Sequence, residues 1–207
     1  MSLDKAKEIT LEGKNVIRLD IDDNSVWKGV PVGYTKIDYI ETTGTQYIDT
    51  GVKANQDTRM VCDIMWTGGM NGFGARSTVS TRNFSVRVID NIWQLGYGNG
   101  VTTCDNNADK KWQIVDINKN ELYVDGVFSI SREYVEFTTP NNLAIGAIKA
   151  GSMYYGTAKY RNCRIYDNGV LIRDFIPCID PDGNVGMFDT VNAKFYKNSG
   201  TETFVTG

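Results

Sequence analysis

The chain has 207 residues, of which 41% are hydrophobic and 23% charged, with a net charge of −3 and no histidine. This length suits one sandwich or barrel domain, and the composition argues against disorder, collagen and coiled coil. The absence of histidine excludes serine–histidine and cysteine–histidine catalysis and metal sites that use imidazole. Composition therefore favours a β protein that is not an enzyme.

The charged residues are dispersed along the chain. No run of Lys and Arg is longer than two residues, whereas nucleic-acid binding needs a concentrated basic surface. The apolar runs are far shorter than the roughly 20 residues that span a bilayer. The first residues, MSLDK, are polar and unlike a signal peptide. We therefore expect synthesis in the cytosol, with neither nucleic acid nor a membrane as a partner.

In chain order, the first 33 residues form a candidate unit of their own. Segment 8–16 runs into a strand at 17–21, and a turn at 22–25 leads toward Trp27. No segment has a sustained helical pattern, and we expect at most one helical turn, at 5–9. A two- or three-stranded hairpin unit buries too little apolar surface to be stable alone. We therefore predict a docking unit at 1–33 and a separate domain at 34–207.

From residue 34 onward apolar and polar residues alternate, and turn residues recur at short intervals. The alternation is clear in the stretches 60–66, 84–88 and 93–97. A period of two in short segments is typical of strands with one buried face. The pattern predicts an all-β sandwich of two antiparallel sheets.

Two pairs of segments read as β-hairpins. The first joins 111–117 to 121–128, and the second joins 161–167 to 170–176 through Asn168-Gly169, a type I′ turn signal. Asp125-Gly126 is also expected to be a turn. Pro177 and Pro181 are expected to end the second pair, because proline cannot donate to a ladder.

The four cysteines are predicted to be free, buried thiols. They lie at 62, 104, 163 and 178, without a C-x-x-C pair and without a common zinc spacing. The register of the second hairpin places Asp174, not Cys178, opposite Cys163, which disfavours a disulfide between these two cysteines. We expect no metal and no cofactor.

An ordered series of motifs covers most of the chain. It begins with YTKIDYIETTGTQYIDTG at 34–51 and runs to the C-terminus. The further blocks are GFGAR at 72–76, YGN at 97–99, LYVDG at 122–126, NLAIG at 142–146, CRIYD at 163–167, DFIPC at 174–178, VGMFDTVN at 185–192 and FYKNSGT at 195–201, followed by Phe204.

These motifs together resemble a known family, the laminin-G-like and concanavalin A-like jelly rolls found in phage and prophage proteins of gut bacteria. The resemblance implies a jelly-roll attachment module of a virion, receptor-binding or fibre-like, that binds host-surface glycan. The hairpin unit at 1–33 would then contact other virion proteins or sister subunits in a homo-oligomer. Two alternatives stay open. One is a capsid-decorating or tail protein that contacts only virion proteins, and the other is a lectin of the bacterial cell surface. Fold analogy alone does not choose among them.

Hydrolytic and calcium-binding patterns are missing. Some jelly rolls of this shape are β-glucanases with Glu-x-Asp-x-x-Glu, which no glutamate here matches, and Glu133 and Glu136 are spaced for opposite faces of a strand. The segment 180–184 begins like a calcium loop but has Val185 where glycine is needed. We predict no catalytic residue.

Aromatic and planar polar residues gather in three segments read as loops, 67–77, 96–109 and 149–157. Sugars are recognised by such groups, since their rings present C–H patches beside hydroxyl pairs. Adjacent tyrosines at 154 and 155 cannot both face a core, so one should be exposed or lie at an interface. The alternative is that these rings fill the sandwich or a subunit contact. The candidate glycan-binding residues are Arg76, Trp93, Tyr97, Asn99, Tyr154 and Tyr155.

Overall fold

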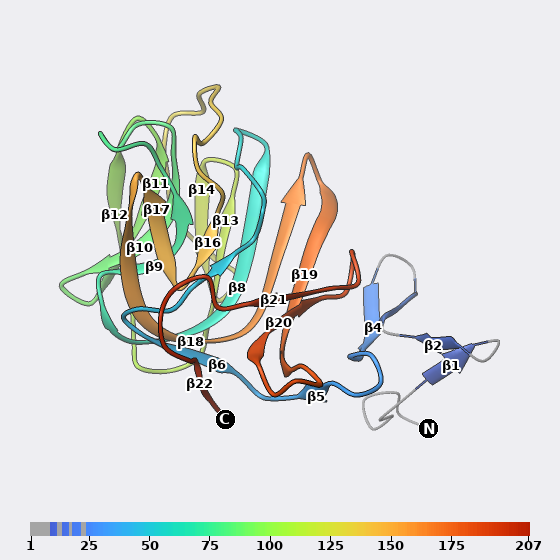
Figure 1. Ribbon diagram of the computed structural model, residues 1–207. Coiled ribbons are helices and arrows are strands. Elements are labelled where there is room, and N and C mark those ends of the chain that lie inside the picture. Colours follow the sequence, from blue (N-terminus) through green and yellow to red (C-terminus); the bar gives the residue numbers. More distant parts are fainter. Residues whose placement is uncertain (1–8, 12–13, 17, 22–23) are drawn as a thin grey trace.

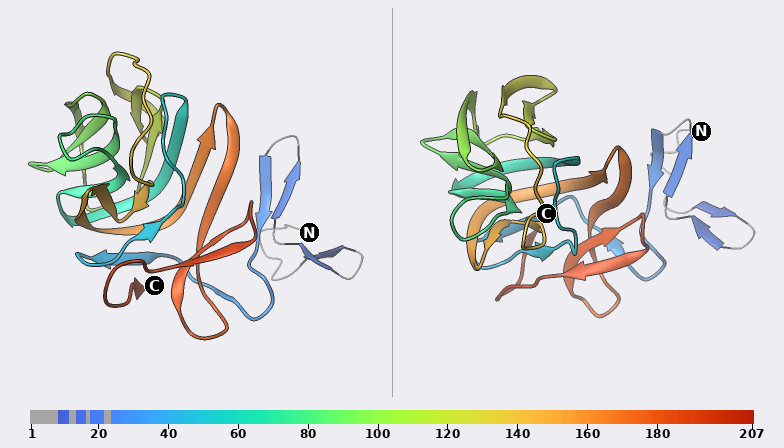
Figure 2. Two further views of the ribbon diagram at one scale, coloured as in Figure 1. Left: turned by 45° about the horizontal axis from the view of Figure 1, so that its top comes forward. Right: turned by 90° about the horizontal axis from the view of Figure 1, so that it is seen from above.

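The computed structural model describes residues 9–11, 14–16, 18–21 and 24–207, with side chains from residue 29 onward. Two sheets lie face to face and form a jelly-roll sandwich (Figure 1), which two further directions also show (Figure 2). The described residues contain strands and turns but no helix, so none of their segments is a helix that could cross a membrane. The prediction of an all-β sandwich is confirmed.

The first layer, here called the front sheet, is built around its two longest strands, β8 and β18, which pair along most of their length. Its main order is β15-β14-β13-β8-β18-β19-β20-β21. Its strands are β5 (Thr35–Lys36), β6 (Ile40–Thr43), β8 (Thr58–Gly69), β13 (Gln113–Asn118), β14 (Glu121–Val124), β15 (Val127–Ser131), β18 (Ser152–Asp167), β19 (Val170–Ile179), β20 (Val185–Asp189), β21 (Lys194–Lys197) and β22 (Val205–Thr206).

The second layer, here called the back sheet, has the order β12-β11-β10-β9-β17. The first residues of β18 pair with β17, and the same strand then continues into the front sheet. The strands of the back sheet are β7 (Ile48–Asp49), β9 (Asn71–Ala75), β10 (Asn83–Ile89), β11 (Ile92–Gly98), β12 (Val101–Asn107), β16 (Ala144–Ile145) and β17 (Ala147–Ala150).

The core lies between the sheets and contains the apolar members of the predicted alternating segments. They are fully or almost fully buried because successive side chains of a strand point to opposite faces. The front sheet contributes Met60, Cys62, Ile64, Val115, Ile117 and Cys163, and the back sheet contributes Phe84, Val86, Val88, Trp93, Leu95 and Tyr97.

The predicted turns form where Asn, Asp and Gly adopt positive φ. Asn168 and Gly169, at φ 46° and 81°, join β18 to β19, which confirms the second hairpin. Asp125 and Gly126, at φ 53° and 77°, join β14 to β15. This turn splits the predicted strand 121–128 in two, because both residues have the left-handed backbone that a tight hairpin requires.

Two details of the second hairpin differ from the prediction. Pro177 lies inside β19 opposite Met187, and its carbonyl oxygen accepts a hydrogen bond from the Ile37 N–H, so this position contributes an acceptor. A bulge in the pairing shifts the register by one, which places Phe175 instead of Asp174 opposite Cys163. All four cysteines are buried and free, as predicted.

Near the N-terminus the described strands form two separate hairpins. β1 (Ile9–Leu11) pairs with β2 (Lys14–Val16), and β3 (Arg18–Ile21) pairs with β4 (Asn24–Lys28). The unit was expected to have two or three strands, whereas its described residues form four short ones. The helical turn predicted at 5–9 falls almost wholly outside the described residues. The docking role and the boundary at residue 33 stay predictions.

Candidate functional site

Two of the six predicted sugar-binding residues lie inside the sandwich. Trp93 and Tyr97 point inward from β11 and are 0% and 1% exposed. The Trp93 indole N–H donates to Gln113 Oε1, and the Tyr97 hydroxyl lies 3.3 Å from the Gln56 carbonyl oxygen. Burial raises the pKa of Tyr97 to about 12. Neither ring can stack on a ligand in solution, so the prediction is wrong for these two residues.

Two others are accessible but lie in different surroundings. Asn99 is exposed in the turn between β11 and β12, and Tyr155 is half-buried in β18 with its ring 6.2 Å from that of Tyr47. Much of the three predicted loops is strand, because β12 and β18 extend through them. The residues therefore do not form one loop cluster.

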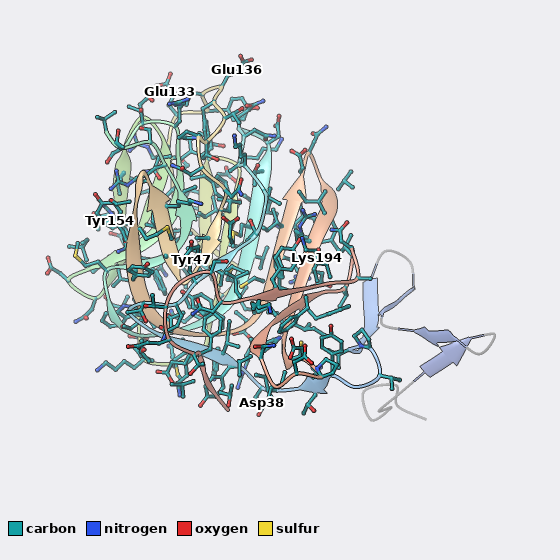
Figure 3. The ribbon with its side chains drawn as sticks, in the orientation of Figure 1. Asp38, Tyr47, Glu133, Glu136, Tyr154 and Lys194 are labelled. Atoms are coloured by element: carbon teal, nitrogen blue, oxygen red, sulfur yellow. The ribbon has the colours of Figure 1, made fainter. Side chains whose placement is uncertain are left out.

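The structure does bring Arg76 and Tyr154 together. The Arg76 Cζ lies 4.9 Å from the centre of the Tyr154 ring, which is 43% exposed. Figure 3 shows Tyr154 on the opposite side of the molecule from Lys194. Arg76 Nη1 already donates to Ser80 Oγ and lies within hydrogen-bond distance of two carbonyl oxygens of its own loop. This guanidinium mainly orders the loop after β9.

A different surface gathers more recognition chemistry, on the outward side of the front sheet. Asp63 of β8 lies directly between Ile114 of β13 and Asn162 of β18. One row further along, Val61 lies opposite Arg164. These five residues line a cleft of about 210 Å³. We call it the front-sheet cleft.

A β-bulge in β18 creates one wall of the front-sheet cleft. Tyr160 and Cys163 are fully buried in the core, and the pairing with β8 shifts between Tyr160 and Asn162. The bulge places two consecutive residues, Arg161 and Asn162, between two inward side chains. Both are half-buried, and both belong to the outward side of the sheet.

Three polar side chains in the front-sheet cleft have no hydrogen-bond or ion-pair partner within the described part of the chain. They are Asp63, Asn162 and Arg164, all half-buried. Their neighbours Arg59 and Asp116 satisfy each other instead, with Nη2 2.7 Å from Oδ2 and Nε 3.0 Å from Oδ1. Half-buried polar groups without partners have donors and acceptors available for a ligand.

The electrostatics of Asp63 reflect its enclosure. Desolvation raises the pKa of this carboxyl above its ordinary value, Arg161 opposes the shift, and Asp125 adds to it. A carboxylate in this setting gains from hydroxyl donors that restore its lost hydration. Sugar hydroxyls are donors of that kind.

Aromatic and cationic side chains flank the front-sheet cleft. The Arg161 guanidinium lies 3.8 Å from the centre of the Trp112 ring, and the Lys159 ammonium lies 4.4 Å from that of Tyr39. The two aromatic rings are 6.0 Å apart. On the other side Phe128 is 53% exposed. The outward side of the front sheet thus combines apolar and planar polar groups.

Sequence reasoning missed the front-sheet cleft because the bulge shifts the alternation of β18. The available signal was the polar pair Arg161-Asn162 between the apolar residues at 160 and 163. Residues three positions apart point to opposite faces of a regular strand, so the two apolar residues could not both face the core without a bulge. Without a known register for β8, that signal names no partner for either residue.

The carboxylates considered for catalysis or calcium lie elsewhere. Glu133 and Glu136 are in the irregular segment after β15 instead of on a strand, at the top of Figure 3. Asp180 Oδ1 accepts the backbone N–H groups of Asp182 and Asn184, as a turn-capping aspartate does. Among the described residues, no group of three His, Cys, Asp or Glu could hold a metal ion.

Comparison with known proteins gives likeness in structure only. No family model and no curated protein matches the sequence. A solved structure from Bacteroides ovatus, described as a "putative carbohydrate binding protein", superposes with a TM-score of 0.52 at 11% identity. The match covers 85% of this chain and 61% of that chain, so this chain spans less than two thirds of its neighbour.

A second solved structure, domains LG4-5 of the mouse laminin α1 chain, superposes with a TM-score of 0.44 at 17% identity. That match covers 80% of this chain and 51% of the laminin chain. At 11% identity the Bacteroides ovatus match concerns the fold alone. The chain is a two-sheet jelly-roll sandwich.

Proposed function

We propose that this chain is a non-enzymatic attachment module that binds glycan in the front-sheet cleft. The observation that carries the proposal is that the polar groups of Asp63, Asn162 and Arg164 have no partner among the described residues. They lie beside the apolar Val61 and Ile114. A sugar presents hydroxyl pairs to planar polar groups and C–H faces to apolar ones. The neighbour from Bacteroides ovatus, with its described carbohydrate binding, supports the same class of ligand.

A binding role fits the carboxylates of the front sheet better than a hydrolytic one. Retaining hydrolysis uses two carboxyl groups about 5 Å apart, one as the acid and one as the nucleophile. Asp116, opposite Val61 of the cleft, is held by two nitrogens of Arg59, and Asp125 accepts the backbone N–H of Ile114. Both oxygens of Asp116 already accept hydrogen bonds from Arg59, so neither is free to act on a substrate.

The biological setting we propose is a phage or prophage virion, with the N-terminal hairpins contacting other virion proteins or sister subunits of a homo-oligomer. The support is the ordered series of motifs that resembles such proteins. Repeated copies would multiply weak single-site affinities. In a lectin of the bacterial surface the front-sheet cleft would also bind glycan. Tail or capsid genes beside this one would favour the virion, and polysaccharide-utilisation genes would favour the lectin.

The test is a glycan array probed with the intact protein and with Asp63→Asn and Asn162→Ala. We expect binding to at least one glycan class and a loss of about tenfold in affinity for each variant. Asp105→Asn, an exposed position on β12, is the matched control for the charge change and should bind like the parent. Tyr154→Ala reports on the other surface.

Two results would overturn the proposal. The first is the absence of glycan binding by the intact protein. The second is binding that Tyr154→Ala abolishes while both cleft variants retain it, which would move the site to the Arg76 and Tyr154 surface.

A further inference from the structure

The charged groups around the front-sheet cleft include two guanidinium groups that form no hydrogen bond or ion pair with a carboxylate within the described part of the chain. Arg59 is paired with Asp116 at 2.7 Å, and Lys159 lies 3.8 Å from Glu41. The remaining charges are the guanidinium groups of Arg161 and Arg164 and the carboxylates of Asp63 and Asp125. Asp125 Oδ1 accepts the backbone N–H of Ile114, which leaves both guanidinium groups available to an anionic ligand.

Arg161 is held in place by its ring contact. At 3.8 Å from the ring centre, its guanidinium lies on Trp112, and within the described part of the chain it forms no hydrogen bond. Stacking of this kind occupies the flat side of a guanidinium and leaves its in-plane N–H groups available. An anion that reaches this edge meets a donor whose position is already fixed.

Arg164 is the stronger anchor, because its side chain lines the front-sheet cleft itself and has no described partner. A planar fork of N–H donors matches a carboxylate by two parallel hydrogen bonds. Arg164 follows Asn162 by two residues, which is about 6.6 Å along a strand. The cleft therefore has two ends, Arg164 for an acid group and Asp63 with Asn162 for hydroxyls. The distance between these ends is about the width of one sugar ring.

We propose that the glycan bound in the front-sheet cleft contains a carboxylate-bearing sugar, whose acid group pairs with Arg164 while its hydroxyls contact Asp63 and Asn162. The inference rests on the proposed function and names its ligand class. A neutral sugar would leave Arg164 half-buried without a counter-charge. An acidic sugar satisfies all three unpartnered groups together.

The probes are methyl glucuronide and methyl glucoside, which differ in one carboxylate, and the measurement is a titration of the intact protein followed by NMR. We expect the glucuronide to bind about tenfold more tightly. Arg164→Gln should abolish this preference, so that the glucuronide binds no more tightly than the glucoside. Arg164→Lys should restore part of it, since lysine keeps the charge and loses the planar fork.

Arg82→Gln is the matched control, because Arg82 is exposed in the loop between β9 and β10. It should keep the preference. Equal binding of the two probes, or a preference that survives Arg164→Gln, overturns the acidic-sugar inference and leaves the proposed function standing. A sulfated glucoside that binds as tightly as the glucuronide overturns the assignment to a carboxylate. If no glycan of any class binds, both proposals fail.

Discussion

Tyr160 and Cys163 both point into the core, although three positions along one strand separate them. Regular alternation would send one of the two outward. The bulge between Tyr160 and Asn162 absorbs the additional residue and brings Arg161 and Asn162 out together beside Asp63. The front-sheet cleft depends on this irregularity of β18.

The Tyr160 hydroxyl links the two sheets, since it donates to the Gly72 carbonyl oxygen at 2.6 Å. Tyr160→Phe removes that bond, and the carbonyl keeps one partner, the Gly146 N–H at 3.0 Å. We expect the free energy of unfolding to fall by about 1 kcal/mol, measured by urea denaturation. Tyr154→Phe, whose hydroxyl has no described partner, should cost less than about 0.5 kcal/mol. Equal losses would contradict the role of the Tyr160 hydroxyl.

Asp63→Asn should separate binding from stability. The pKa of Asp63 is raised by burial, so the stability that this carboxyl contributes is present below its ordinary value of 3.8 and is lost as the pH rises through the folded-state value. Removing the ionisation should leave the variant at least as stable as the parent at neutral pH. The difference should shrink on acidification, because the parent carboxyl becomes neutral too.

Urea midpoints over a pH series check this prediction. A variant that is less stable than the parent at neutral pH would show that the Asp63 carboxylate has a stabilising partner. In that case the loss of glycan binding in Asp63→Asn could no longer be assigned to the ligand contact alone.

Trp112 is expected to act on the ligand through Arg161. Trp112→Ala releases the guanidinium and should weaken glucuronide binding by about two- to fivefold, which corresponds to an exposed cation–π contact. Arg161→Gln should have a similar effect, and the double variant should be little worse than either one. Trp112→Phe should restore part of the affinity. Strictly additive losses in this double-mutant cycle would contradict the coupling.

Gly74 in β9 tests the close packing of the back sheet. Its φ is 137°, and an added Cβ would overlap the Phe84 carbonyl oxygen and Ser85. Gly74→Ala should cost about 3 kcal/mol, the sum of backbone strain and overpacking. Gly183→Ala is the matched control, with φ 82° and open space around it, and should cost about 1 kcal/mol. Thermal or urea unfolding measures the difference, and similar costs would contradict the overlap.

Local patterns predicted much of the fold. The alternation in 60–66, 84–88 and 93–97 places the right side chains in the core, and Asn168-Gly169 turns where a type I′ hairpin is expected. These features depend on neighbours along the chain, so a single sequence contains them. The loop boundaries were predicted less well, since β12 pairs with the preceding strand β11, and β18 pairs first with β17 and then with β8, which is distant in sequence.

The site was predicted less well than the fold for a related reason. Aromatic residues such as Trp93 and Tyr97 suit a sugar platform and a core equally, and only the facing sheet decides between these places. Of the two adjacent tyrosines, Tyr154 is exposed and Tyr155 is half-buried, which agrees with the expectation that their exposure differs. Asp63 gave no local signal, since its importance comes from what lies opposite it.

By itself, the sequence determined that the chain is an all-β sandwich with free, buried cysteines, because period-two alternation and turn chemistry act over a few residues. Only the tertiary structure decided where ligand chemistry gathers. Asp63, Ile114 and Asn162 come from three strands, and cross-strand pairing together with one bulge makes them neighbours. Pairing between distant strands depends on the whole packed sandwich, so no local stretch of the sequence encodes the front-sheet cleft.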